Sequence, residues 1–185
     1  GDDDLWAGAG LSLAGTWVFQ GRVSEAKELL TTCIARAGGE TRIEAIYQLG
    51  TTCAQEGDLD QAVLHYAEAL PLIRTLDKPT WEGNLLGNRG VMNIYRGQYD
   101  QAIADLDAAI GLHADQGPSM YSLHRDNKAY ALQLRGDLSA AIDLYEENER
   151  FQHEHNLPTL MYSQRCTAYL AAGMYEEAME LAQRA

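Results

Sequence analysis

A column of polar side chains recurs along the chain and could bind an extended peptide. Its members each stand nine residues before one of five similarly placed glycines, and they are Ser12, Gln48, Asn88, Asn127 and Gln164. Asparagine and glutamine amides both donate and accept hydrogen bonds, so they can pair with the backbone of an extended segment. We therefore interpret the four amides of this column as candidate ligand contacts.

Three cations directly follow the last three members of this polar column: Arg89, Lys128 and Arg165. A cation beside an amide can hold a carboxylate of a ligand. The alternative is that each cation pairs with an acidic neighbour between helices, as a strut from surface to core. The sequence leaves both interpretations open. The full set of candidate peptide-binding residues is Gln48, Asn88, Arg89, Asn127, Lys128, Tyr130, Gln164 and Arg165.

Other residue types that perform chemistry lack the necessary spacing. His153 and His155 are two residues apart, which on a helix points them in different directions, so we expect exposed histidines at a helix end and no metal pair. Cys33, Cys53 and Cys166 are far apart and favour buried free thiols of a reducing compartment. No glycine-rich phosphate loop is present. We therefore expect no catalytic residue, metal or cofactor.

Five glycines mark an internal repeat whose period is 36 to 40 residues. Each glycine is followed two residues later by an apolar residue, three later by Ser, Asp or Glu, and five later by alanine. Glycine permits the left-handed backbone that ends one helix, and the polar residue suits the start of the next. The alanine, with a small residue seven before each glycine, predicts a close approach of two helices. The glycines are Gly21, Gly57, Gly97, Gly136 and Gly173.

Helical periodicity on both sides of each glycine predicts an all-α chain of ten helices. The expected helices span 5–20, 24–37, 41–56, 60–76, 80–96, 100–114, 119–135, 139–155, 159–172 and 176–185. They form five hairpins in one α-solenoid domain over 1–185, at about 5–37, 41–76, 80–114, 119–155 and 159–185. Pro79, Pro118 and Pro158 are expected at helix starts. Stacked hairpins would bring the polar column into a ladder along a concave face.

In one repeat, a large apolar residue is followed by a Leu-Gly pair, then by a small residue, an alanine and an aromatic residue. The residues are Ile46, Leu49, Gly50, Cys53, Ala62 and Tyr66. This order resembles the tetratricopeptide repeat (TPR) family, and the resemblance covers nearly the whole chain. It implies a right-handed α-solenoid that binds proteins or peptides. The repeats are longer than the roughly 34 residues usual in that family.

A narrower resemblance concerns segments 88–97, 104–113 and 165–173. They are similar to the repeat region that precedes the caspase-like domain of bacterial CHAT proteins, although similar helices occur in bacterial signalling ATPases and transcription regulators. The resemblance implies a bacterial protein with a peptidase domain beyond residue 185. Because the sequence ends within a helical pattern, we also expect a fragment of a longer protein.

The charge balance restricts the partners. The chain has 27 acidic and 14 basic residues and a net charge of −13, and its basic residues form no cluster. Nucleic acid and anionic membranes are therefore poor partners. The acidic run 146–149 is expected to be a solvated helix face. The N-terminus is acidic, and the apolar stretch 5–19 is too short to span a bilayer, so we expect a cytoplasmic protein.

The sequence thus favours a non-catalytic scaffold. Its expected ligand is a protein or peptide that has a carboxylate or an acidic side chain. Two other functions stay open. One is a regulatory domain that senses a small molecule or signal peptide by changing its curvature. The other is a self-association module, in which an open terminal repeat forms a homo-oligomer.

Overall fold

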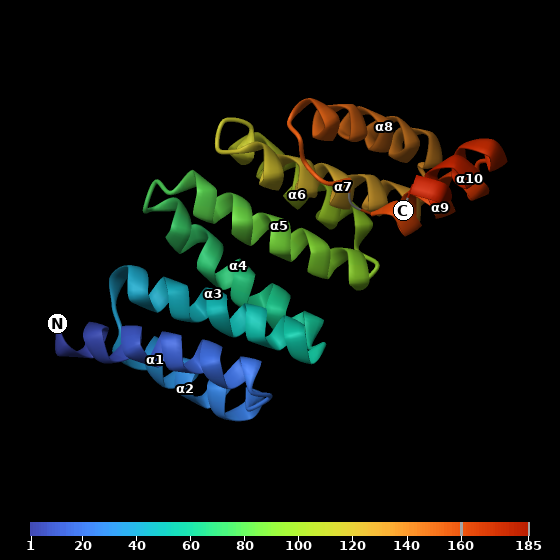
Figure 1. Ribbon diagram of the computed structural model, residues 1–185. Coiled ribbons are helices and arrows are strands. Elements are labelled where there is room, and N and C mark those ends of the chain that lie inside the picture. Colours follow the sequence, from blue (N-terminus) through green and yellow to red (C-terminus); the bar gives the residue numbers. More distant parts are fainter. Residues whose placement is uncertain (160, 185) are drawn as a thin grey trace. The chain divides into compact units, whose positions relative to one another are not determined.

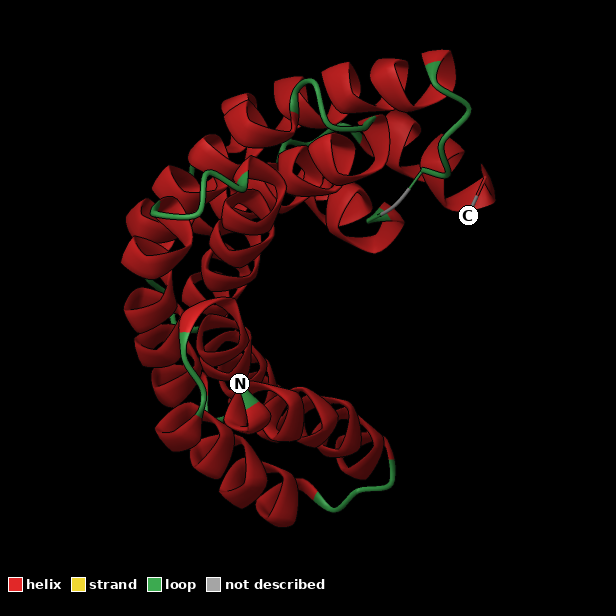
Figure 2. Ribbon diagram, turned by 90° about the vertical axis from the view of Figure 1, so that its left-hand side faces the viewer, coloured by secondary structure: helices red, strands yellow, loops and turns green. Residues whose placement is uncertain are grey.

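The computed structural model describes residues 1–159 and 161–184, and each regular element within them is an α-helix (Figures 1 and 2). This confirms the all-α prediction. The helices are α1 (Asp2–Phe19), α2 (Val23–Arg36), α3 (Gly39–Glu56), α4 (Leu59–Arg74), α5 (Pro79–Tyr95), α6 (Tyr99–His113), α7 (Pro118–Arg135), α8 (Leu138–Glu154), α9 (Tyr162–Ala171) and α10 (Tyr175–Arg184).

The chain forms two compact units, Gly1–Arg96 and Gly97–Ala185. In the first unit each helix packs on the next in sequence, and in addition α1 packs on α3 and α3 on α5. In the second unit α6 packs on α7, α7 on α8, α8 on α9 and α9 on α10. We refer to α1, α3, α5, α7 and α9 as the first helices, because each precedes a turn glycine. In the first unit, successive first helices are therefore neighbours.

The repeat glycines end these helices as predicted. All five have positive φ angles, between 71° at Gly97 and 103° at Gly136, which is the left-handed backbone that glycine adopts most easily. After Gly57, the side chain of Asp58 accepts a hydrogen bond of 3.2 Å from the backbone N–H of Gln61 and so caps α4. Each turn thus reverses the chain within a few residues.

The predicted close approach of the two helices of a hairpin is confirmed between α3 and α4. A Cβ atom placed on Gly50 would lie 3.0 Å from Cε1 of Tyr66 and 3.2 Å from Cβ of His65. On the other side of each turn, the repeat alanines are at most 4% exposed, and they are Ala26, Ala62, Ala102, Ala141 and Ala178. Small residues therefore let the helices pack closely.

The ninth helix differs from the expected range 159–172. It begins at Tyr162, because Met161 has a φ of 60° and a left-handed residue cannot be part of an α-helix. Pro158 therefore precedes the helix, whereas Pro79 and Pro118 are the first residues of α5 and α7 as expected. Residues 160 and 185, which the expected ranges included, lie outside the described residues.

The cysteines are free thiols, with Cys33 and Cys53 buried and Cys166 half-buried. Burial raises the pKa of the Cys33 and Cys53 thiols, so both are held in the poorly nucleophilic protonated form. His153 and His155 are exposed at the end of α8. In the described part of the chain, the helices are too short or too polar to cross a membrane.

Candidate functional site

A groove separates two first helices of the first unit. We call it the α1/α3 groove, and its volume is about 460 Å³. Its lining residues are Gly8, Leu11, Ser12 and Gly15 of α1, with Thr41, Glu44, Tyr47, Gln48 and Thr51 of α3. Two members of the polar column, Ser12 and Gln48, thus line one groove from opposite sides. Of the predicted site residues, Gln48 is the one that this groove contains.

Gln48 joins the two walls of the groove. Its Nε2 donates a hydrogen bond of 3.1 Å to the backbone carbonyl of Leu11. The amide crosses to α1 because Gly15 leaves room for it, since a Cβ on Gly15 would lie 3.2 Å from Nε2 of Gln48. The side chain is half-buried and lines the groove, and its amide oxygen can accept a hydrogen bond.

Asn88 forms the next contact between first helices. Its Nδ2 donates a hydrogen bond of 2.7 Å to the hydroxyl of Tyr47, which links α5 to α3. Burial raises the pKa of Tyr47, so its hydroxyl is protonated near neutral pH and can donate as well as accept. Sequence reasoning missed Tyr47, although it directly precedes a member of the polar column.

A second groove lies between two first helices of the second unit. This α7/α9 groove has a volume of about 270 Å³ and is lined by Tyr130, Gln133, Leu134, Ser163, Gln164 and Thr167. It contains two predicted residues, Tyr130 and Gln164. Ser163 donates a hydrogen bond of 2.8 Å to Oε1 of Gln164, which orients that amide. Asn127 is half-buried on α7, three residues before Tyr130 and one helical turn away.

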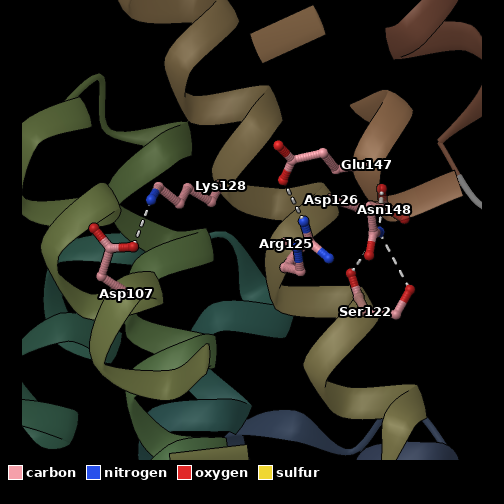
Figure 3. Close-up of polar contacts among 7 residues, drawn as sticks. All are labelled: Asp107, Ser122, Arg125, Asp126, Lys128, Glu147 and Asn148. Atoms are coloured by element: carbon pink, nitrogen blue, oxygen red, sulfur yellow. Dashed lines mark hydrogen bonds and ion pairs between the residues drawn. The ribbon is translucent and has the colours of Figure 1, made fainter. Parts of the chain in front are cut away.

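Lys128 and Arg165 form ion pairs with acidic residues of neighbouring helices. Nζ of Lys128 lies 2.6 Å from Oδ1 of Asp107 on α6 (Figure 3). Nη2 of Arg165 lies 2.6 Å from Oε2 of Glu149 on α8, and Arg165 is only 1% exposed. These are the struts of the alternative interpretation. Arg165 is not a surface cation, because α8 and α9 enclose its guanidinium, so we remove it from the candidate site. Arg89 is half-buried on α5.

A buried polar cluster holds α7 to α8, and its members Ser122, Asp126, Asn148 and Gln152 are each at most 3% exposed. Nδ2 of Asn148 donates to Oδ1 of Asp126 at 2.8 Å, and Nε2 of Gln152 donates to Oδ2 of Asp126 at 3.0 Å (Figure 3 shows the Asn148 contact). Asn148 also donates to the carbonyl of Ser122 at 3.0 Å. Burial raises the pKa of the Asp126 carboxyl.

This cluster corrects the expectation that run 146–149 is a solvated face. Asn148 is fully buried and Glu149 pairs with Arg165, although Glu147 is exposed and accepts a hydrogen bond of 2.9 Å from the largely buried Arg125 (Figure 3). The cluster also fixes the rotation of α7. Because Asp126 faces α8, the next residue, Asn127, is turned about 100° away from that interface.

Within residues 1–159 and 161–184, no three His, Cys, Asp or Glu side chains lie close enough together to hold a metal ion. Two histidines do meet in the second unit, where the rings of His113 on α6 and His124 on α7 stack with 5.1 Å between their centres. Burial, then the neighbouring His113, lowers the pKa of His124 to about 4, so the His124 ring is neutral near pH 7.

Comparison with known proteins places this geometry in context. Residues 43–74, which span α3 and α4, match the model of the tetratricopeptide repeat family. No functionally curated protein matches the sequence. Several solved structures share the fold. One is a putative kinesin light chain of Podosopora anserina with nearly identical TPR-like repeats. It has a TM-score of 0.79 at 20% identity and covers 95% of this chain and 90% of that chain.

Two further structures share the fold. BtubC (BKLC) from P. vanneervenii has a TM-score of 0.81 at 16% identity, over 94% of this chain and 76% of that one. A Signal Transduction ATPase with Numerous Domains (STAND) from Pyrococcus horikoshii, which has a tetratricopeptide repeat sensor, has a TM-score of 0.84 at 14% identity, over 100% of this chain and 30% of that one. At such identities the likeness concerns the fold. The chain therefore contains a tetratricopeptide repeat and has the fold of TPR-like repeat proteins.

Proposed function

We propose that the chain is a non-catalytic scaffold that binds an extended protein segment along its first helices. One observation carries the proposal: each unit has a groove between successive first helices, and equivalent repeat positions line both grooves. Gln48 and Gln164 each stand nine residues before a turn glycine, and Thr51 and Thr167 each stand six before. A ligand segment would therefore meet the same kinds of side chain in the groove of either unit.

Polar contacts to the ligand backbone would supply the specificity. The groove amides Gln48 and Gln164 are half-buried. A ligand that covers them loses binding free energy unless it replaces the hydrogen bonds that these amides make with water. An extended peptide satisfies them, because its backbone offers both a donor and an acceptor at each residue other than proline. We keep in the site Tyr130, which lines the same groove as Gln164, and Asn127, which is one helical turn from Tyr130 on α7.

The sequence also suggested that the ligand has a carboxylate. Lys128 is the main support for this part of the proposal. Its pair with Asp107 is at the surface, with 25% and 51% of the two side chains exposed. Such pairs contribute only about 0–1 kcal/mol, so a ligand carboxylate could replace Asp107. Arg165 cannot take part in this exchange, because its guanidinium is buried.

The test selects short random peptides on the purified chain and measures their affinity by fluorescence anisotropy. The variant Gln48→Ala should weaken peptides bound in the first unit, and Gln164→Ala those bound in the second. Gln101→Ala is the matched control, because Gln101 is exposed on α6 and lines neither groove. Selected peptides that bind all three variants as tightly as the unaltered chain would overturn the proposed site. Hydrolysis of a peptide or nucleotide by the purified chain would overturn the non-catalytic role.

We further propose that this scaffold is the recognition or regulatory segment of a larger bacterial protein in the cytoplasm. The similarity of segment 88–97 to the repeat region of CHAT proteins supports this assignment. A sensor role is the alternative, because the Pyrococcus horikoshii structure contains a TPR sensor and this chain covers only 30% of it. Small-angle scattering with and without a selected peptide separates the two, since a sensor changes its shape on binding and a rigid scaffold does not.

Self-association is a second candidate function, and the exposed side of α10 favours it. Tyr175 and Met179 are 65% and 63% exposed and stand four residues apart, so they lie on the same face of the helix. Sedimentation at increasing protein concentration tests this function, and Met179→Glu should abolish any dimer that uses this face. A concentration-independent monomer would exclude it.

A further inference from the structure

The α1/α3 groove has a negative charge that no other described side chain neutralises. Glu44 is exposed and is the one charged residue among the described lining residues, and no ion pair joins it to another described residue. Arg42 is only two residues away, but residues at that spacing do not face each other on a helix, and Arg42 does not line the groove. Lys78, which also contacts α3, pairs with Glu40 instead.

The groove's uncharged polar groups direct several of their donors away from the open space. Ser12 donates its hydroxyl proton to the carbonyl of Gly8 at 3.4 Å, and Thr51 donates to the carbonyl of Tyr47 at 3.2 Å. One N–H of Gln48 is taken by the carbonyl of Leu11. The groove therefore presents oxygen lone pairs from the Glu44 carboxylate, the Gln48 amide oxygen and the Ser12 hydroxyl, whereas the Thr51 hydroxyl also bonds the hydroxyl of Tyr66 at 3.1 Å.

The groove also has room for a long side chain. Gly8 and Gly15 form much of its α1 wall, and a Cβ on Gly8 would meet no atom within 4 Å. The volume of about 460 Å³ lies within the range of roughly 300–1,000 Å³ that is usual for small-ligand sites. An acceptor-rich space of this size suits a side chain that has several donors and a positive charge.

We infer that the α1/α3 groove takes a basic side chain, arginine or lysine, of the bound segment, with its cation at Glu44. This inference rests on the proposed function and adds the chemistry of one ligand position. Arginine has five N–H donors and lysine three, so either can satisfy the Glu44 carboxylate and the Gln48 amide oxygen together. The net charge of −13 attracts such a segment at long range, whereas Glu44 fixes its register at contact distance.

The experiment titrates the isotopically labelled whole chain with a short blocked peptide that has one central arginine, and follows the backbone amide signals by NMR. The matched probe replaces arginine by citrulline, which has nearly the same shape but no charge. We expect the arginine peptide to shift signals of residues 8–15 and 41–51, and the citrulline peptide to bind at least about tenfold more weakly. Equal affinity of the two peptides would overturn the inference.

Two variants locate the effect. Glu44→Gln should weaken the arginine peptide by at least about tenfold, whereas Glu28→Gln should not, because Glu28 is an exposed, unpaired glutamate on α2 outside the groove. Gly8→Leu should block the groove sterically, and it fits the fold because Gly8 is helical with open space at its Cβ. Full binding to either Glu44→Gln or Gly8→Leu would sink the assignment.

The outcomes also separate this inference from the proposed function. If Gly8→Leu blocks library-selected peptides that lack a basic residue, the groove is a peptide site but the assignment of a basic side chain is wrong. If no groove variant weakens the binding of any selected peptide, the proposed function itself is wrong, and the inference that rests on it falls with it. Binding of the arginine peptide that requires both Glu44 and an open groove supports both statements together.

Discussion

The side chain of Gln48 on α3 reaches the backbone carbonyl of Leu11 on α1 with a hydrogen bond of 3.1 Å. One residue of the polar column therefore both lines the groove and ties its two walls together. Gln48→Ala would remove a structural contact as well as a ligand contact, so its effect on binding must be corrected for a loss of stability of about 1 kcal/mol. Asn88 likewise links two first helices, through its hydrogen bond to the hydroxyl of Tyr47.

Asn127→Ala should weaken the affinity for a selected peptide by roughly 1–3 kcal/mol if the amide pairs with a desolvated ligand backbone. Its stability should change little, because Asn127 is half-buried, unlike its buried neighbour Asp126. Anisotropy and urea unfolding on the same preparation measure both quantities. A fall in stability with unchanged affinity would show that Asn127 is a structural residue and would remove it from the site.

Arg165→Ala and Lys128→Ala should differ sharply in their effect on stability, although both residues follow directly after a column residue. Arg165 is 1% exposed, and its loss removes a buried guanidinium together with its ion pair to Glu149, which should cost roughly 3–5 kcal/mol. The Lys128 pair is at the surface and should contribute only about 0–1 kcal/mol. Chemical denaturation measures both values, and equal losses would contradict the burial difference.

Gly50→Ala should destabilise the chain, even though alanine favours helices over glycine by about 1 kcal/mol. The new Cβ would lie 3.0 Å from the ring of Tyr66 and 3.2 Å from Cβ of His65, so α3 and α4 must move apart. Gly111→Ala is the control, because a Cβ there meets nothing within 4 Å and should stabilise α6. Thermal unfolding gives the sign of each change. An increase in Tm for both variants would refute the close contact.

The stability of the chain should fall as the pH drops from about 6.5 towards 4, through His124. Burial, then His113, lowers the pKa of His124 to about 4 in the folded state, below the value of 6.5 in the unfolded chain. In this window the unfolded state binds more protons than the folded state, so acid favours unfolding. The contribution is complete above pH 6.5 and approaches a loss of roughly 3 kcal/mol near pH 4.

The control for this prediction is His124→Phe, which keeps a ring against His113 but cannot titrate. Its free energy of unfolding should depend less on pH between about 4 and 6.5 than that of the unaltered chain. The comparison cancels the contribution of Asp126, whose carboxyl pKa is raised by burial and which acts in the opposite direction. The same slope in both proteins would exclude His124 as the cause.

The helical repeat could be predicted from the sequence because its signals are local. A glycine that must adopt a positive φ angle, such as Gly57, and a helix-packing alanine five residues later, Ala62, are both within one turn of the chain. Conformational preference and small size act over such short spans whatever surrounds them. The periodic spacing of these signals then determined the order and approximate length of the helices. The start of α9 could not be predicted this way, because the left-handed Met161 has no signature in its residue type.

The roles of the polar residues depended on contacts between helices. Lys128 and Arg165 occupy the same repeat position, yet one reaches Asp107 at the surface and the other is enclosed with Glu149. Their partners are 21 and 16 residues away in sequence, and burial depends on the volumes of all neighbouring side chains. Glu44 likewise looks like any exposed helical glutamate in the sequence. Only the packing of α1 on α3, with two glycines in the facing wall, places it in a groove.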